Sequence, residues 1–410
     1  RLTEQIYFAL QYILETDNIG VVINAQHFCV KSRGVEDVGS STITTANFNG
    51  DSSFPRSNTF GTLNLAGPAG TTYTFGSGTT QTINTALNVQ PGNCSALINI
   101  NSSSSGTQAT LNIPSGNPTL AYVNLKDMKA QGGATFTANS VIDLGNNSGW
   151  TLSPLASNNY YWVGGSGNWG SQLNWSTTSG GSPSGCAPTP ADNVIFDANS
   201  FSAPSQTVTI DVATPTCKNM TWTNLTNATP IFNSNNKTLN IYGSLTISPN
   251  MSFSQNPSIN FLANTTGQTI TFSGKTLGNL EFRGIGGGWT FQDRPRTGSI
   301  SLNNGALSTN NLICDFGSLS SESGNLRSLD LGTSTLNISG GLYITNTSNL
   351  TFLGNDATVN ITGGGALSTI GLRFDAINFT SPQEGLDLNY GPYIANTMTF
   401  NHNCRYFRGN

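Results

Sequence analysis

The chain has 410 residues, of which only 9% are charged, and its formal net charge is −4. Because soluble domains usually carry about 25% charged residues, this composition is unusual, and it argues against a nucleic-acid or anionic-membrane partner. The hydrophobic 36% occurs largely in short alternations, which indicate a folded, β-rich chain rather than a disordered one. No apolar run reaches the roughly 18 residues that a membrane-spanning helix requires.

The N-terminal fifty residues are predicted to form a small unit of mixed structure. Apolar residues at helical spacing predict a first helix, which residues 17–20 end: Leu2, Ile6, Leu10, Ile13 and Leu14. Residues 21–25 and 41–45 then have the composition of strands. A helix with two strands is too small to bury a core alone, so this unit needs neighbours.

From about residue 60 onward the chain consists of short strand-like segments separated by Gly, Ser, Asn and Pro. Two all-β arrangements fit this pattern: stacked antiparallel β-sandwiches, or a right-handed β-solenoid whose coils stack on one another. Recurring Leu/Ile-x-Ile/Phe triplets flanked by Asn and Gly favour the solenoid, in which Asn side chains can stack at the corners. The predicted fold is therefore mainly β, with a small N-terminal α+β fragment.

We divide the chain into three parts: residues 1–50, the mixed fragment; residues 51–158, a first β-rich repeat block; and residues 159–410, a second, solenoid-like block. The chain begins at Arg1 rather than at a methionine, so we expect a fragment or a processed form. The lack of a visible signal peptide then carries no information.

One motif in the N-terminal fragment combines residue types suited to catalysis. His27, Cys29, Lys31 and Arg33 are spaced two apart, so in a strand they share one face. A thiolate beside an imidazole suits a zinc ion and a proton-transfer group, and the basic side chains suit a phosphorylated substrate.

The residues around this motif resemble the C-terminal part of GTP cyclohydrolase I. The resemblance rests on RLTEQI at residues 1–6, VINAQHFCVKSRGV at 22–35 and STITT at 41–45. It implies that Cys29 binds zinc, that His27 is a general acid/base, and that Lys31 and Arg33 contact the triphosphate of GTP. The implied reaction is the conversion of GTP to dihydroneopterin triphosphate. Zinc is expected only if a further segment supplies the family's other ligands.

Three tryptophans, Trp162, Trp169 and Trp175, lie in a stretch rich in Gly and Ser. Exposed rings of this kind stack on sugars, which would define a carbohydrate-binding module, but the same residues could instead cap the end of a β-domain. Cys186 and Cys217 could form a disulfide in an exported chain or be isolated buried thiols. His402 and the scattered acidic residues form no evident acid–base pair.

The segment from residue 160 to residue 222 resembles repeats of large exported, adhesin-like surface proteins of Bacteroidetes-type bacteria, and a looser likeness extends over residues 60–400. The likeness implies an extracellular or cell-surface location and a surface glycan or neighbouring cell-surface protein as partner. The leading hypothesis is therefore a structural or adhesive surface protein without a complete active site. The alternatives are GTP cyclohydrolase I, which would be cytoplasmic, and a carbohydrate-binding module.

Overall fold

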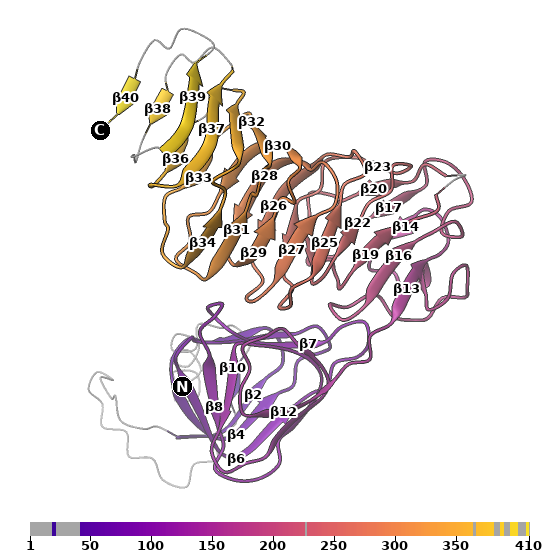
Figure 1. Cartoon of the computed structure of the whole chain (residues 1–410). Coiled ribbons are helices and arrows are strands. Elements are labelled where there is room, and N and C mark those ends of the chain that lie inside the picture. Colours follow the sequence, from indigo (N-terminus) through magenta and orange to yellow (C-terminus); the bar gives the residue numbers. More distant parts are fainter. Residues whose placement is uncertain are drawn as a thin grey trace. The chain divides into compact units, whose positions relative to one another are not determined.

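The computed structural model describes residues 19–21, 42–225, 228–363, 366–380, 386–388, 394–400 and 407–409. The chain divides into two compact units, residues 1–156 and residues 157–410. Within each unit, Figure 1 shows short strands stacked side by side in successive coils, which is a β-solenoid. The described residues contain a single short helix, the 3-10 turn Gln172–Asn174.

The first unit contains two six-stranded sheets, and the chain passes from one to the other as it completes each coil. The first sheet has the spatial order β1 (Ile19–Val21), β2 (Thr42–Phe48), β4 (Asn58–Leu65), β6 (Thr80–Val89), β8 (Ala109–Asn112) and β10 (Met128–Gln131). The second has the order β3 (Ser52–Phe54), β5 (Thr72–Phe75), β7 (Ile98–Ser102), β9 (Thr119–Lys126), β11 (Phe136–Asp143) and β12 (Trp150–Pro154).

The second unit begins with three strands per coil. Its ten-stranded sheet has the order β15 (Trp175–Ser176), β13 (Asn159–Trp162), β16 (Asn193–Phe196), β19 (Met220–Trp222), β22 (Leu245–Thr246), β25 (Gln268–Thr271), β27 (Gly288–Phe291), β29 (Gly305–Ser308), β31 (Arg327–Asp330) and β34 (Leu350–Leu353). A four-stranded sheet has the order β14 (Gly167–Asn168), β17 (Thr207–Thr209), β20 (Ile231–Asn233) and β23 (Ser252–Phe253). This sheet stops at β23.

A twelve-stranded sheet runs through the rest of the second unit. Its main path is β18 (Thr216–Cys217), β21 (Leu239–Ile241), β24 (Ile259–Phe261), β26 (Leu277–Phe282), β28 (Arg296–Leu302), β30 (Ile313–Ser320), β32 (Thr335–Ile338), β35 (Thr358–Ile361), β37 (Arg373–Phe379) and β39 (Ile394–Phe400). The other two strands of this sheet are β33 (Leu342–Ile344), which pairs with β30, and β36 (Leu367–Thr369), which pairs with β33. A separate two-stranded sheet contains β38 (Leu386–Leu388) and β40 (Phe407–Gly409).

The core of each unit is filled by the alternate residues of its strands, which point inward because side chains in a strand change face at every residue. Parallel, in-register pairing places the same inward position of successive coils side by side. Phe54 thus stacks on its register partner Phe75 at 4.7 Å between ring centroids. Phe261 stacks on Phe282 in the same way at 5.1 Å. These spacings match the ~4.8 Å between neighbouring strands.

A column of glycines crosses the twelve-stranded side of the second unit. An alanine Cβ at Gly317 in β30 would lie 1.9 Å from the carbonyl oxygen of Gly298 in β28. A Cβ at Gly340 would in turn lie 2.6 Å from the carbonyl oxygen of Gly317, which accepts a hydrogen bond from the Gly340 N–H. Only glycine allows these backbones to approach so closely.

The structure confirms the predicted mainly-β fold and its solenoid form, and the antiparallel sandwich is wrong because nearly all the described strand pairs are parallel. The strand expected at residues 41–45 is observed as β2, with bounds three residues longer at its C-terminal end. The predicted first helix lies outside the described residues, as does most of the strand expected at residues 21–25.

Candidate functional site

The residues of the predicted catalytic motif, His27, Cys29, Lys31 and Arg33, lie outside the described residues. Their flanking segment is partly described, because β1 lies before the motif and β2 after it. β2 pairs in parallel with β4 and contributes the buried side chains of Ala46 and Phe48 to the core of the first unit. The described strands of this fragment, β1 and β2, therefore belong to the first solenoid sheet.

Trp162, Trp169 and Trp175 form one buried cluster at the start of the second unit. Their exposed fractions are 0%, 2% and 0%. Trp175 contacts both neighbours edge-on, with centroid distances of 5.0 Å to each. The indole N–H of Trp162 donates to the carbonyl oxygen of Gly165, and that of Trp175 donates to the carbonyl oxygen of Trp169, both at 2.7 Å.

This geometry corrects the sugar-stacking interpretation of the three tryptophans. Stacking on a sugar requires an exposed ring face, whereas all three rings here are covered by protein, and those of Trp162 and Trp175 pack against Phe196 of the next coil. β15, which contains Trp175, runs antiparallel beside β13, the first parallel strand of its sheet. The tryptophans therefore belong to the end of the solenoid core, as the alternative interpretation expected.

Two described cysteines of the second unit, Cys217 and Cys314, are buried thiols. Cys217 is a free, fully buried thiol, so the considered disulfide with Cys186 does not form. Burial raises the pKa of Cys217, with the charge of Asp192 adding to the effect. Burial also raises the pKa of Cys314 to about 12. Because the thiolate is the reactive form, the thiols of Cys217 and Cys314 are unreactive near neutral pH.

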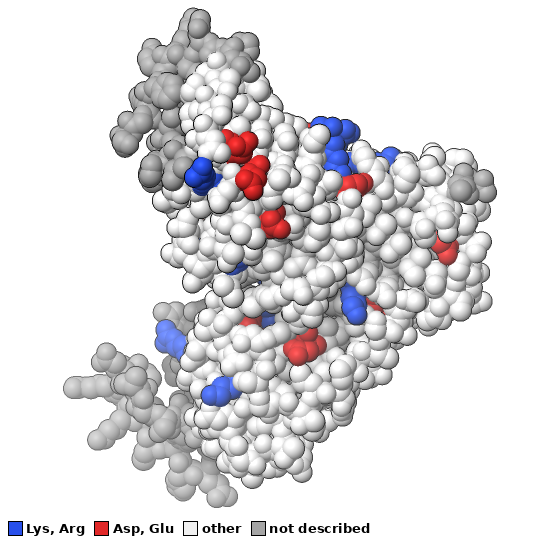
Figure 2. All heavy atoms as spheres, viewed as in Figure 1, with Lys and Arg blue, Asp and Glu red and all other residues white. Residues whose placement is uncertain are grey.

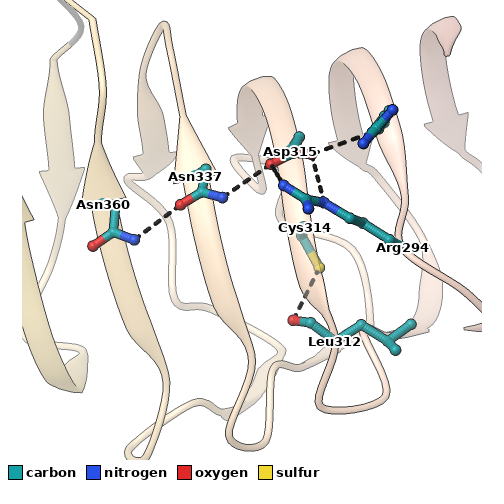
Figure 3. Close-up of polar contacts among 7 residues, drawn as sticks. Arg294, Leu312, Cys314, Asp315, Asn337 and Asn360 are labelled. Carbon is teal, nitrogen blue, oxygen red and sulfur yellow. Dashed lines mark hydrogen bonds and ion pairs between the residues drawn. The ribbon is translucent and has the colours of Figure 1, made fainter. Parts of the chain in front are cut away.

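A row of side chains that are hydrogen-bonded from strand to strand, here called a ladder, lies on the outward face of the twelve-stranded sheet (Figure 3). Asp315 in β30, Asn337 in β32, Asn360 in β35 and Asn378 in β37 occupy one register position in successive strands. Each asparagine donates from Nδ2 to the preceding residue of the ladder, at 2.9, 2.9 and 3.0 Å. The ladder thus has one direction and ends on a carboxylate.

Two arginines hold that carboxylate from the other side. Arg294 makes a bidentate ion pair with Asp315, with both nitrogen–oxygen distances at 2.8 Å, and Arg296 lies 3.5 Å from it. Partial burial acts to raise the pKa of Asp315. Hydrogen bonds from Arg294 and Asn337 and the two positive charges outweigh that effect, so its pKa lies below the usual value. Asp315 is therefore a fixed negative charge rather than a proton donor.

Similar asparagine ladders occur in both units, and all of them donate toward the preceding coil. In the first unit, Asn88 donates to Asn64 and Asn64 donates to Asn47. Asn124 likewise donates to Asn99, but the buried Oδ1 of Asn124 has no partner because Ile142 occupies the next register position. The sequence analysis expected stacked asparagines at corners, whereas these lie within strands. The Asn at the centre of many Leu/Ile-x-Ile/Phe triplets, such as Leu336-Asn337-Ile338, is the pattern that could have located them.

A second unanticipated feature is the buried guanidinium of Arg327, which is 2% exposed. It donates to the hydroxyl and carbonyl oxygens of Ser321 and to the carbonyl oxygens of Asn325, Asn346 and Ser348. No ion pair among the described residues involves it. Burial lowers its pKa. Arg327 thus ties the turns of two successive coils together.

Charged side chains on the face shown in Figure 2 lie in small, separated groups on a largely uncharged surface. Within the described ranges, no three His, Cys, Asp or Glu side chains gather as a metal site would require. A small apolar cavity, of about 10 Å³, is lined by core residues such as Trp222, Phe232 and Leu277. The described residues establish no complete active site.

These features define a β-solenoid repeat protein with rows of outward asparagines that are hydrogen-bonded from coil to coil. No helix in the described part of the chain is long and apolar enough to cross a membrane. Comparison with known proteins adds a relationship for the N-terminal segment alone. The family model for GTP cyclohydrolase I matches residues 1–58.

Curated relatives named GTP cyclohydrolase 1 match this segment. Those of Blochmanniella pennsylvanica and Pasteurella multocida are each 59% identical over 46 residues, which are 11% of this chain and 21% of the relative. That of Haemophilus influenzae is 56% identical over the same length. The chain therefore spans about a fifth of the length of the relatives it matches. No solved structure matches the chain.

Proposed function

We propose that this chain is an extracellular or cell-surface protein whose solenoid has a structural or adhesive role. The observation that carries the proposal is the outward face of the sheets, where small uncharged side chains are joined in ladders from coil to coil. Asn193 donating to Asn159 and Asn219 donating to Asn193 give one such row in the second unit. Rows of this kind make a long, regular surface from repeated units.

The same observation favours a surface role on physical grounds. Neutral hydrogen-bonded ladders do not depend on ion pairing, which salt weakens at exposed sites. Repeat proteins also present extended surfaces suited to large partners. The partner we propose is a surface glycan or a neighbouring cell-surface protein.

Location is tested by labelling intact cells of the source organism with a membrane-impermeant biotin reagent. We expect the chain to be labelled while a cytoplasmic marker protein stays unlabelled. Labelling of the chain only after lysis, alongside that marker, would contradict a surface location.

Adhesion is tested by binding of the purified full chain to an array of immobilised glycans and to intact cells. Ser301→Glu with Ser320→Glu places two negative charges on adjacent strands of the twelve-stranded sheet. Ser328→Glu with Thr351→Glu is the matched control on adjacent strands of the ten-stranded sheet. If the partner docks on the twelve-stranded sheet, its binding should be lost with the Ser301→Glu and Ser320→Glu pair and kept with the control pair. An unmodified chain that binds neither glycans nor cells would remove the adhesive role and leave the structural one.

A second candidate is GTP cyclohydrolase I activity, which the 59% identity over 46 residues favours. By resemblance, Cys29 would bind zinc, His27 would transfer protons, and Lys31 and Arg33 would bind GTP. The test is fluorimetric detection of neopterin after incubation of the full chain with GTP and zinc. Turnover that His27→Ala abolishes would establish the enzyme. No turnover, together with zinc bound below one equivalent, would remove it.

A further inference from the structure

Two strand pairs stand apart from the rest of the solenoid. Among the named strands of the described residues, only β1–β2 and β13–β15 are antiparallel. Each pair lies at the edge of its sheet where the stack of parallel strands begins. In the first unit β1 lies outside β2, and in the second unit β15 lies outside β13, although β15 follows β13 in the sequence. The two units therefore begin their first sheets with the same arrangement.

An exposed first strand is a physical problem for any stack of parallel coils. Its outer edge carries a row of unpaired N–H and C=O groups, which can pair with another chain. An added antiparallel strand satisfies part of that row, and it does not repeat the coil that would allow further stacking. A very short outer strand also presents little edge of its own.

The dimensions of both pairs fit this role. β2 has seven residues and is covered by the three-residue β1, and β13 has four residues and is covered by the two-residue β15. The register of the first pair places Ile19 opposite Phe48, Gly20 opposite Asn47 and Val21 opposite Ala46. Phe48 and Ala46 are buried core residues, so β1 lies at the end of the first unit's core.

We infer that β1 is an end cap, and that the cyclohydrolase-like segment supplies this chain with a strand that closes the first solenoid against edge-to-edge pairing. In the second unit β15, within the tryptophan-rich segment, has the same role. This structural role of residues 19–21 needs no zinc or GTP and is independent of the adhesive role.

A cross-link tests the position of the cap without disrupting it. Directly opposed residues of an antiparallel pair have Cα atoms about 4.5–5.5 Å apart, which a disulfide can bridge. Gly20→Cys with Asn47→Cys in the full chain should therefore form the disulfide on mild oxidation. Gly20→Cys with Thr45→Cys is the control, because the shift of two residues moves the second Cα about 7 Å along the strand. Peptide mapping that finds no link, or equal yields for both pairs, would overturn the assignment.

Removal of the cap tests what it does. Proline donates no backbone hydrogen bond, and alternate N–H groups of an edge strand face its neighbour. Of two consecutive residues, one therefore directs its N–H toward the neighbouring strand. Gly20→Pro with Val21→Pro removes both N–H groups and so at least one hydrogen bond between β1 and β2. Ser105→Pro is the control, because Ser105 lies in an exposed turn of the same unit.

We expect the double variant to show at least about tenfold faster amide exchange in β2, with concentration-dependent self-association, while β9 and β11 stay protected. The Ser105→Pro control should match the unmodified chain in both measurements. If the double variant keeps unmodified exchange in β2 and stays monomeric at high concentration, β1 is not a cap. Should the double variant fail to fold, the single variants Gly20→Pro and Val21→Pro, measured in the same two ways, decide the question.

Discussion

The glycine column allows one substitution to test how closely the coils pack. Gly317→Ala would place a Cβ 1.9 Å from the carbonyl oxygen of Gly298, whereas real Cβ contacts essentially never fall below 3.0 Å. Since the obstacle is backbone rather than a flexible side chain, β28 and β30 must separate by roughly 1 Å. The hydrogen bond from the Gly340 N–H to the Gly317 carbonyl lies beside the displaced segment.

The expected cost follows from these contacts. Overpacking in a close-packed region costs about 1–3 kcal/mol, and each weakened backbone hydrogen bond adds about 1 kcal/mol. We therefore expect Gly317→Ala to lower the free energy of unfolding of the second unit by about 2–4 kcal/mol. For a unit of this size that corresponds to a fall in Tm of roughly 5–15 °C.

The matched control is Gly324→Ala, which lies in the connection between β30 and β31. At Gly324 the nearest atom to an added Cβ is Nδ2 of Asn346 at 3.7 Å, which is an ordinary contact. Alanine there should stabilise the chain slightly, by up to about 1 kcal/mol, because it restricts the unfolded state. Calorimetry of both variants gives the comparison. Equal Tm values for the two variants would refute the close approach of the coils at Gly317.

Three further predictions concern single side chains. Arg327→Met should lower the free energy of unfolding by about 3–5 kcal/mol in urea titrations, because the buried oxygens that Arg327 contacts lose their donors. Arg327→Lys should recover only part of that loss. A loss below about 1 kcal/mol for Arg327→Met would contradict the role of Arg327 in joining the two turns. Because the pKa of Asp315 is lower in the folded chain, its contribution is present above about pH 4 and is lost as pH falls through the folded value. Asp315→Asn should therefore flatten the acid limb of the stability–pH profile, and an unchanged limb would contradict this. Cys217 and Cys314 should resist thiol reagents at pH 8 until denaturant is added, as peptide mapping would show, whereas native-state labelling would contradict their burial.

The fold could be predicted because its determinants are local. The alternation of apolar and polar residues in segments such as Leu239–Ile241 and Ile259–Phe261 indicates which side chains enter the core. Gly and Asn indicate where the chain turns. The parallel direction of pairing was favoured rather than required, because period-two alternation is the same in parallel and antiparallel strands. The recurring triplets supplied the preference.

The candidate sites were less predictable because they depend on register between coils. Asp315 and Asn337 are 22 positions apart in sequence and adjacent in the sheet, and nothing local marks them as partners. The burial of Trp162, Trp169 and Trp175 depends on the antiparallel return of β15, which the Gly/Ser-rich composition of that stretch does not specify. Arg327 reads as a surface residue in sequence, since arginine is rarely buried.

The unpartnered Oδ1 of Asn124 has a consequence for how such chains grow. An asparagine ladder with one fixed donor direction always leaves one acceptor over at its last rung, whatever its length. Where that last oxygen is buried, a ladder of two rungs such as Asn99 and Asn124 carries the cost for a single amide–amide hydrogen bond, whereas a longer ladder would divide it among several. Where the terminal oxygen is buried, adding a coil with asparagine at the same register therefore improves the average per coil. Selection on stability alone would then favour lengthening existing rows over starting new ones.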